Sequence, residues 1–146
     1  MKARLGLVAL ILCAFFLLGM GNFEQSEKPG EIPHPDKEVS VNISDSDGQV
    51  LNLTQFSLNG QPYITGKLGA GQVAIPLEQI RAVSLSSEGK EILAKVEMTD
   101  HTQMNVYMDK AVTAYGKLKF GTYKIALERL RKIEILDVKE RKRERQ

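Results

Sequence analysis

The chain has 146 residues, of which 42% are hydrophobic, and a formal net charge of +2. This length provides for one ordinary globular domain after processing. The near-neutral charge and the small share of aromatic residues, 6% with no tryptophan, argue against a nucleic-acid partner. The single cysteine, Cys13, excludes a disulfide framework within one chain.

The N-terminus has the pattern of a targeting segment. Two basic residues precede an uninterrupted apolar run, Leu5–Leu18, and the small residues Gly19 and Gly21 follow it. The run is shorter than the ~20 residues of a typical membrane-spanning helix. It therefore predicts a signal helix over residues 1–21, cleaved after Gly21, and export to the periplasm of a bacterium. The alternative is an inner-membrane anchor formed by residues 5–21.

The rest of the chain divides by composition. Residues 22–38 are polar and contain three prolines, which resist helix and sheet, so they predict an extended tether. Residues 39–138 are expected to form a duplicated β-domain, with repeat 1 over 39–88 and repeat 2 over 89–138. Residues 139–146 are charged throughout and predict a frayed tail.

Alternation and turn residues predict five strands in repeat 1. Val39, Val41 and Ile43 alternate with polar neighbours, as in a half-buried strand. Asp-Gly and Asn-Gly pairs favour hairpin turns, and Pro76 ends a strand because it lacks an amide hydrogen. A single helical turn is expected directly after Pro76. The expected strands are 39–44, 50–58, 63–68, 72–75 and one that begins at Ile80.

Repeat 2 shows the same signals. Strands are expected over 92–98, 103–108 and 111–118, followed by a further hairpin and a last strand over 130–138. Beyond residue 38, no segment of eight or more residues has convincing helical periodicity. The predicted fold class is all-β: a single small sandwich or barrel-like domain built from two tandem repeats of ~50 residues related by a pseudo-two-fold axis.

The repeat is most evident in one stretch of twenty residues. Gly66 to Leu85 reads GKLGAGQVAIPLEQIRAVSL, and Gly116 to Ile135 reads GKLKFGTYKIALERLRKIEI. At an offset of 50 residues, eight of the twenty positions are identical. A repeat of this kind indicates one supersecondary unit used twice, neither copy able to bury its apolar face alone.

Most shared positions of this stretch have a mechanical explanation. Gly71 and Gly121 are expected to permit turns, and the alternating apolar residues are expected to face the core. The shared charges are Glu78 and Arg81 in the first copy and Glu128 and Arg131 in the second. A spacing of three residues in a helical turn predicts an ion pair in each copy. The functional alternative makes these four residues contacts for a partner or an anion, with Arg81 and Arg131 as twin sites.

The repeated pattern resembles small exported bacterial β-repeat proteins of uncharacterised function, in which a hairpin of the form G-x-x-x-I-P-x-x-x-I-x-x-I recurs. It is also similar to N-terminal segments of some outer-membrane-associated proteins. The resemblance covers about twenty residues per copy, and Ala126 stands where the second copy would have its proline. It implies an envelope location and a β architecture, and it implies no catalytic residue.

Other candidates give weaker signals. His101 and the pair Asp45 and Asp47 fall in expected turns, where they would have to line a cleft to support an enzyme. Neither matches a metal-ligand or nucleophile pattern, so we predict no catalytic residue, no cofactor and no metal. A cluster of methionines in repeat 2, with Tyr107, is expected to fill the core; an adaptable partner groove is the alternative. These methionines are Met98, Met104 and Met108.

Charge is unevenly distributed along the chain. Residues 22–91 carry 10 acidic and 5 basic side chains, whereas residues 92–146 carry 8 acidic and 13 basic ones. The basic C-terminal half could make a weak contact with an anionic membrane surface. The main prediction is a non-enzymatic exported β-domain, a structural or binding module whose partner is another envelope protein or a second copy. The alternative is a carrier of a small apolar ligand in a cavity between the repeats.

Overall fold

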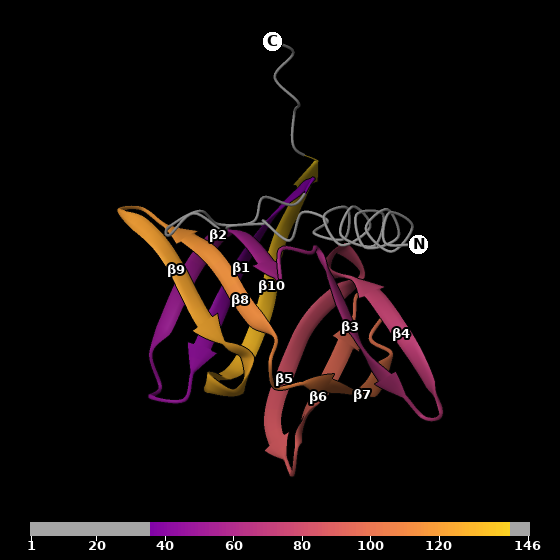
Figure 1. The fold of residues 1–146 in the computed structure, drawn as a ribbon. Coiled ribbons are helices and arrows are strands. Elements are labelled where there is room, and N and C mark those ends of the chain that lie inside the picture. Colours follow the sequence, from indigo (N-terminus) through magenta and orange to yellow (C-terminus); the bar gives the residue numbers. More distant parts are fainter. Residues whose placement is uncertain (1–35, 141–146) are drawn as a thin grey trace, which may run out of the picture. The chain divides into compact units, whose positions relative to one another are not determined.

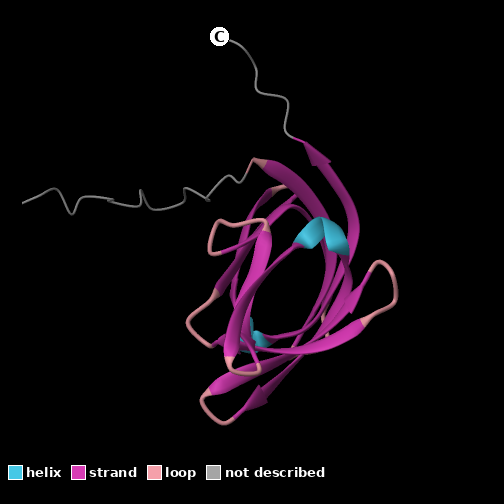
Figure 2. Ribbon diagram, turned by 90° about the vertical axis from the view of Figure 1, so that its right-hand side faces the viewer, coloured by secondary structure: helices cyan, strands magenta, loops and turns pink. Residues whose placement is uncertain are grey.

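The computed structural model describes residues 36–140, and the expected signal peptide, most of the tether and most of the tail lie outside them. The described chain is all-β, as predicted: ten strands form one antiparallel sheet that is not closed. Two short 3-10 turns interrupt the strands, and Figure 2 shows them on the strongly curved sheet. The strands are β1 (Lys37–Asp45), β2 (Val50–Leu58), β3 (Tyr63–Leu68), β4 (Gly71–Pro76), β5 (Ile80–Glu88), β6 (Glu91–Met98), β7 (Gln103–Asp109), β8 (Thr113–Leu118), β9 (Gly121–Ala126) and β10 (Leu130–Glu140); the turns are η1 (Leu77–Gln79) and η2 (Leu127–Arg129).

In the sheet, each half of the chain has one hairpin that pairs with a strand of the other half, which we call an exchange of hairpins. The order is β4-β3-β7-β6-β5-β10-β1-β2-β8-β9, so the β3–β4 hairpin joins β7 and the β8–β9 hairpin joins β2. Interchanging β1–β5 (the first half) with β6–β10 (the second half) turns this order into its own reverse. Figure 1 shows the resulting two groups of five strands, which meet at β5 and β10.

The junction between the two groups is short and symmetric. Strands β5 and β10 pair through three residue pairs, with Val83 opposite Ile133 at the centre. These two residues are 50 positions apart, and both are fully buried. The offset of 50 also relates β3 to β8, β4 to β9 and η1 to η2 residue for residue.

The core follows the alternation of the strands. In β1, Val39, Val41 and Ile43 are buried as predicted, because successive side chains of a strand point to opposite faces of the sheet. Burying an aliphatic or aromatic side chain contributes about 1.5–3 kcal/mol, so these inward residues supply most of the driving force for folding. The largest fully buried side chains are Phe56, Ile43, Leu53, Ile64, Leu77, Ile80, Ile92, Met108, Leu127, Leu130, Ile133 and Val39.

The two 3-10 turns are held in the same way. The Leu77 N–H donates to the Pro62 carbonyl at 2.9 Å, and the Leu127 N–H donates to the Val112 carbonyl at 3.0 Å. Both leucines are buried. Pro76 is the last residue of β4, as expected of a residue without an amide hydrogen. The helical turn expected after Pro76 is confirmed.

The shared glycines serve purposes other than those expected. Neither Gly71 nor Gly121 has a positive φ; in the β3–β4 turn that conformation belongs to Gly69, at φ +59°. Gly66 and Gly116 are instead required by close packing. A Cβ on Gly66 would lie 2.5 Å from the Tyr107 carbonyl oxygen, and one on Gly116 would lie 2.9 Å from the Leu53 Cβ. Gly66 and Gly116 therefore let the β3–β4 and β8–β9 hairpins lie close to β7 and β2.

The sheet extends beyond the expected bounds at both ends. Lys37 and Glu38, which were assigned to the tether, pair in β1 with Glu140 and Lys139, which were assigned to the tail. Each of these cross-strand pairs joins opposite charges, an arrangement that favours continued pairing. No helix within residues 36–140 is long and apolar enough to cross a membrane.

Candidate functional site

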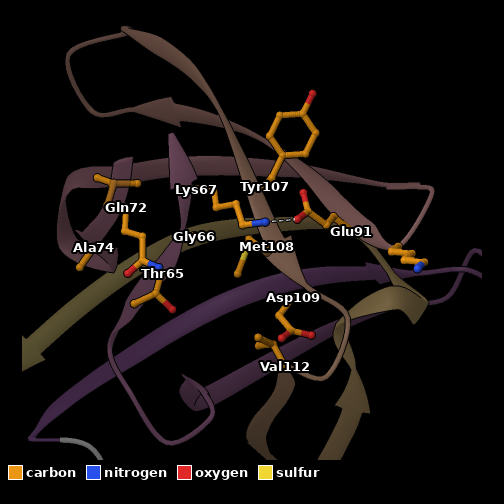
Figure 3. A pocket seen from close by; sticks show the side chains of 12 residues that line it. Thr65, Gly66, Lys67, Gln72, Ala74, Glu91, Tyr107, Met108, Asp109 and Val112 are labelled. Atoms are coloured by element: carbon orange, nitrogen blue, oxygen red, sulfur yellow. Dashed lines mark hydrogen bonds and ion pairs between the residues drawn. The ribbon is translucent and has the colours of Figure 1, made fainter. Parts of the chain in front are cut away.

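A hollow lies where the β3–β4 hairpin leaves its neighbour β7. Six residue pairs join β3 to β4, but only the pair Lys67–Tyr107 joins β3 to β7. Beyond this pair the strands separate and leave an open cavity of about 610 Å³ (Figure 3). It is lined by Thr65, Gly66, Lys67, Gln72, Val73, Ala74, Lys90, Glu91, Tyr107, Met108, Asp109 and Val112. The hollow therefore lies between strands of the two halves, and we call it the inter-half hollow.

Its rim is charged. The Lys67 ammonium and the Glu91 carboxylate form an ion pair at 2.5 Å, drawn as a dashed line in Figure 3. The hydrogen bond and charge of Glu91 raise the pKa of Lys67 above its ordinary value. The negative charge of Glu88 raises the pKa of Tyr107, with desolvation as the second cause. Both groups therefore keep their protons throughout the neutral range.

The floor of the inter-half hollow is apolar. Met108 and Val112 are buried, and Val73 is partly buried against the same core. Met108 and Tyr107 come from the methionine-rich strand for which core filling was expected. Met108 does fill the core, and it also forms part of this hollow. An apolar floor under a charged rim suits a side chain or a small ligand that has both an apolar body and a polar group.

The hollow lies next to a free edge of the sheet. Within residues 36–140, strand β4 pairs only with β3, and Gln72, Val73 and Ala74 of β4 line the hollow. Residues 68–77, which contain this edge strand, include no charged side chain. Strand β9 is the other edge, and there Lys124 stands where β4 has Ala74.

The predicted ion pair between Glu78 and Arg81 does not form. Glu78 instead accepts a hydrogen bond from Lys37 at 2.5 Å. Arg81 lies 3.5 Å from the Glu97 carboxylate and 3.3 Å from His101 Nδ1. The reason is that β5 begins directly after η1 and pairs with β6, which places Arg81 beside side chains of the neighbouring strand. Helical spacing therefore does not determine its partner.

The second copy makes different contacts. Arg131 Nη1 donates to the backbone carbonyl of Glu128 at 3.2 Å and to that of Leu130 at 3.4 Å. The carboxylate of Glu128 is not its partner, so the second predicted ion pair is also wrong. Arg81 and Arg131 have unlike surroundings, which argues against a pair of matched anion sites.

Arg81 and His101 do come together in a second groove. This groove measures about 460 Å³ and is lined by Glu78, Ile80, Arg81, Thr99, His101 and residues 135–138 of β10. His101 is in the β6–β7 turn with a φ of +69°, and its Nδ1 is 3.5 Å from Glu97. Its position in a turn is as expected; its proximity to Arg81 follows from strand pairing that the sequence did not indicate.

Of the two turn aspartates, Asp45 has a local structural role. Asp45 Oδ1 accepts hydrogen bonds from the backbone N–H groups of Asp47 and Gln49, each at 2.9 Å, which closes the β1–β2 turn. Within residues 36–140, no three His, Cys, Asp or Glu side chains are grouped so that they could hold a metal ion.

A family model described as "Uncharacterised protein" matches residues 35–140. Comparisons with curated proteins and with solved structures give no match. The family match covers the whole described sheet and well over half of the chain. The chain therefore belongs to this family.

Proposed function

We propose that this protein is a non-enzymatic, exported β-domain that serves as a binding module of the bacterial envelope. Its ligand would be an extended segment of another envelope protein, added as a strand to β4. One observation carries the proposal: an uncharged free edge of the sheet adjoins the inter-half hollow. In strand addition, main-chain hydrogen bonds supply affinity and a neighbouring pocket supplies specificity.

The register of the β3–β4 hairpin determines which groups of β4 are free. Leu68 and Gly71 close a two-residue turn, so their pair is hydrogen bonded, and hydrogen-bonded pairs alternate along the ladder. The backbone groups of Gln72 and Ala74 then point away from β3. Pro76 ends the series because it has no N–H. The edge offers two residues, which is too short for a stable dimer of large area but enough to align a peptide whose side chain enters the hollow.

The other edge strand, β9, is protected. Edge strands are commonly guarded by lysine, which prevents pairing with other chains. Lys124 is exposed near the middle of β9, and Lys119 is exposed in the turn that precedes it. The contrast between β4 and β9 supports a binding role for β4.

Two further parts of the proposal rest on the sequence. Residues 1–21 support export, and sequencing the N-terminus of the mature protein from its native envelope tests it: a start at Asn22 supports cleavage, and a start at Met1 supports an anchor. Duplication of one unit is supported by the eight identities and by the symmetric strand order. The basic second half and acidic first half then mark where the copies diverged.

The strand-addition proposal is tested with two matched variants of the tagged full-length chain. Gln72→Pro removes an outward N–H of β4 without removing a bond to β3, and Thr122→Pro makes the same change at the equivalent position of β9. We expect Gln72→Pro to lose an envelope partner that both the unmodified chain and Thr122→Pro retain. Equal retention by both variants, each checked for an unchanged melting temperature, would contradict strand addition.

The alternative function, a carrier of a small apolar ligand, is favoured by the apolar floor of the same hollow. Thr65 lines the hollow from its exposed side. Thr65→Phe should fill part of the hollow and lower the affinity for an apolar fluorescent probe, while Thr122→Pro, on β9 outside the hollow, should leave probe binding unchanged. A carrier would also yield a lipid or metabolite on purification rather than a protein.

A further inference from the structure

The β8–β9 hairpin ends in a turn of unusual composition. Phe120 at this tip is 90% exposed. The same hairpin carries three exposed lysines: Lys117 near the end of β8, Lys119 in the turn and Lys124 in β9. Residues 111–127 contain these three basic side chains and no acidic one. A single exposed aromatic residue is common on protein surfaces, so the lysines around it are what distinguish this tip.

The equivalent hairpin of the first half provides an internal comparison. The strands of the β3–β4 hairpin match those of the β8–β9 hairpin residue for residue at the offset of 50. Its tip has Gly69 and Ala70 where the other has Lys119 and Phe120. The strand register does not require the basic and aromatic residues, since a hairpin with the same register forms without them. The turns themselves differ, because Gly69 has a φ of +59° and Lys119 does not have a positive φ.

The lysines of the β8–β9 hairpin are available. Lys67, the equivalent of Lys117, is neutralised by Glu91. Within residues 36–140, by contrast, Lys117, Lys119 and Lys124 have no ion pair with an acidic side chain. Lys124 instead lies over the ring of Tyr115, with its Nζ 5.7 Å from the ring centroid, a contact that leaves its positive charge uncompensated.

The lysines and the aromatic side chain lie on one exposed feature. Lys117 pairs with Thr122, and Tyr115 pairs with Lys124, so these four side chains share the outer face of the hairpin. In Figure 1 the β8–β9 turn lies on the upper side of the sheet, where β1 begins and β10 ends.

We infer that the β8–β9 tip docks on an anionic lipid bilayer, with Phe120 in the interfacial layer and the lysines on lipid phosphates. Amphipathic elements bind membranes in this way, through buried apolar area added to electrostatic attraction. A lipid surface fits better than an acidic protein because the tip is convex: a bilayer deforms around a protruding ring, whereas a protein would need a matching cavity. The inference rests on the proposed export, which brings the domain to a membrane surface.

The test is co-sedimentation of residues 22–146 with lipid vesicles. This segment contains every described strand and every buried core residue, so it retains the whole sheet. Vesicles of phosphatidylglycerol and phosphatidylethanolamine should bind it, vesicles of phosphatidylcholine should bind it much less, and added salt should weaken binding. The basic tail is the same in every variant, so differences between variants report on the hairpin.

Four variants make the test specific. Phe120→Ala should reduce binding to anionic vesicles about tenfold, and Lys119→Gln and Lys124→Gln should each reduce it about fivefold. Lys95→Gln removes an exposed charge of β6, in the other group of strands, so it is the control and should leave binding unchanged. Thermal unfolding of each variant checks that the sheet is intact.

Three results would overturn the inference. One is equal binding to neutral and anionic vesicles, and another is loss of binding in Lys95→Gln equal to that in Lys119→Gln. The third is binding of soluble polyglutamate, but of neither kind of vesicle, with the same dependence on the lysines, which would indicate an acidic protein partner. Failure of export would instead appear as recovery of the native protein in the cytoplasmic fraction of the cells, whatever its lipid binding, so the two failures are distinguishable.

Discussion

Val83 and Ile133 face each other at the centre of the β5–β10 pair, and they occupy equivalent positions of the two sequence repeats. A residue that faces its own equivalent across antiparallel strands lies next to a local two-fold axis. From this centre the strands follow in the order β5-β6-β7-β3-β4 in one direction and in the equivalent order β10-β1-β2-β8-β9 in the other. The first half supplies β3, β4 and β5 to one group of five strands and β1 and β2 to the other. The second half supplies the equivalent strands to the opposite groups, β6 and β7 to the first of these and β8, β9 and β10 to the second.

The exchange predicts that neither half folds alone as a monomer. Without residues 89–146, β3 lacks its neighbour β7 and β5 lacks β6 and β10. We expect residues 22–88, expressed alone, to be unfolded or to associate into a dimer in which two copies exchange hairpins. Sedimentation together with amide proton dispersion in NMR spectra measures this. A monomer with cooperative unfolding would contradict the exchanged arrangement.

The close approach of the exchanged hairpins predicts a clear order of glycine substitutions. Gly66→Ala places a Cβ against the Tyr107 carbonyl, and Gly116→Ala places one against Leu53. Overpacking of this kind typically lowers the free energy of unfolding by about 1–3 kcal/mol. Gly121→Ala is the matched control, because no atom lies within 4 Å of its Cβ and its φ is not positive. Denaturant titration should find Gly121→Ala nearly neutral; a loss as large as that of Gly66→Ala would exclude this explanation.

Replacement of Ser57 by alanine is expected to stabilise the fold. It is fully buried in β2, and within residues 36–140 its hydroxyl has no hydrogen-bond partner. Leaving a buried hydroxyl unpaired costs about 1–3 kcal/mol. Ser57→Ala removes the polar atom with little change in shape, so we expect the free energy of unfolding to rise by about 1 kcal/mol. If urea titration shows a loss instead, the hydroxyl is satisfied by ordered water.

Asp100, in the β6–β7 turn, is expected to make a pH-dependent contribution to the free energy of unfolding. Its carboxylate accepts a hydrogen bond from the Thr102 N–H at 2.9 Å, and this bond holds the pKa of Asp100 below its ordinary value of 3.8. A lowered pKa in the folded state contributes stability above pH 3.8 that is lost as the pH falls through the folded-state pKa. Asp100→Asn should therefore be less stable than the unmodified protein at neutral pH, and the difference should shrink on acidification. A difference that stays constant down to the acid transition would contradict this cause.

The sequence was sufficient to predict the elements, because alternation and turn residues act locally. Val39 to Ile43 alternate, Asp47-Gly48 turns the chain, and Pro76 precedes the 3-10 turn, as expected. What the sequence could not provide is which strands become neighbours. The pairing of Lys67 with Tyr107 joins residues of different repeats, and no local pattern indicates it.

The same limit applies to the candidate site. Helical spacing predicts an ion pair of Arg81 with Glu78. In the structure Arg81 instead contacts Glu97 and His101, because β5 pairs with β6. The inter-half hollow exists because β3 diverges from β7, and these two strands belong to different repeats. One signal for the site was present in the sequence: residues 68–77 lack charge where the equivalent residues 118–127 carry two lysines. Comparing the repeats for their differences would have indicated the edge strands.

Site-specific photo-cross-linking in the native envelope shows whether the edge of β4 receives a partner strand. A photoreactive residue is placed at Ala74 on β4 or at Lys124 on β9, in the tagged full-length chain. We expect a cross-linked protein from position 74 that is lost when Gln72→Pro is added, and none from position 124. Equal protein cross-linking from both positions, or cross-linking from position 74 that Gln72→Pro leaves unchanged, would contradict strand addition.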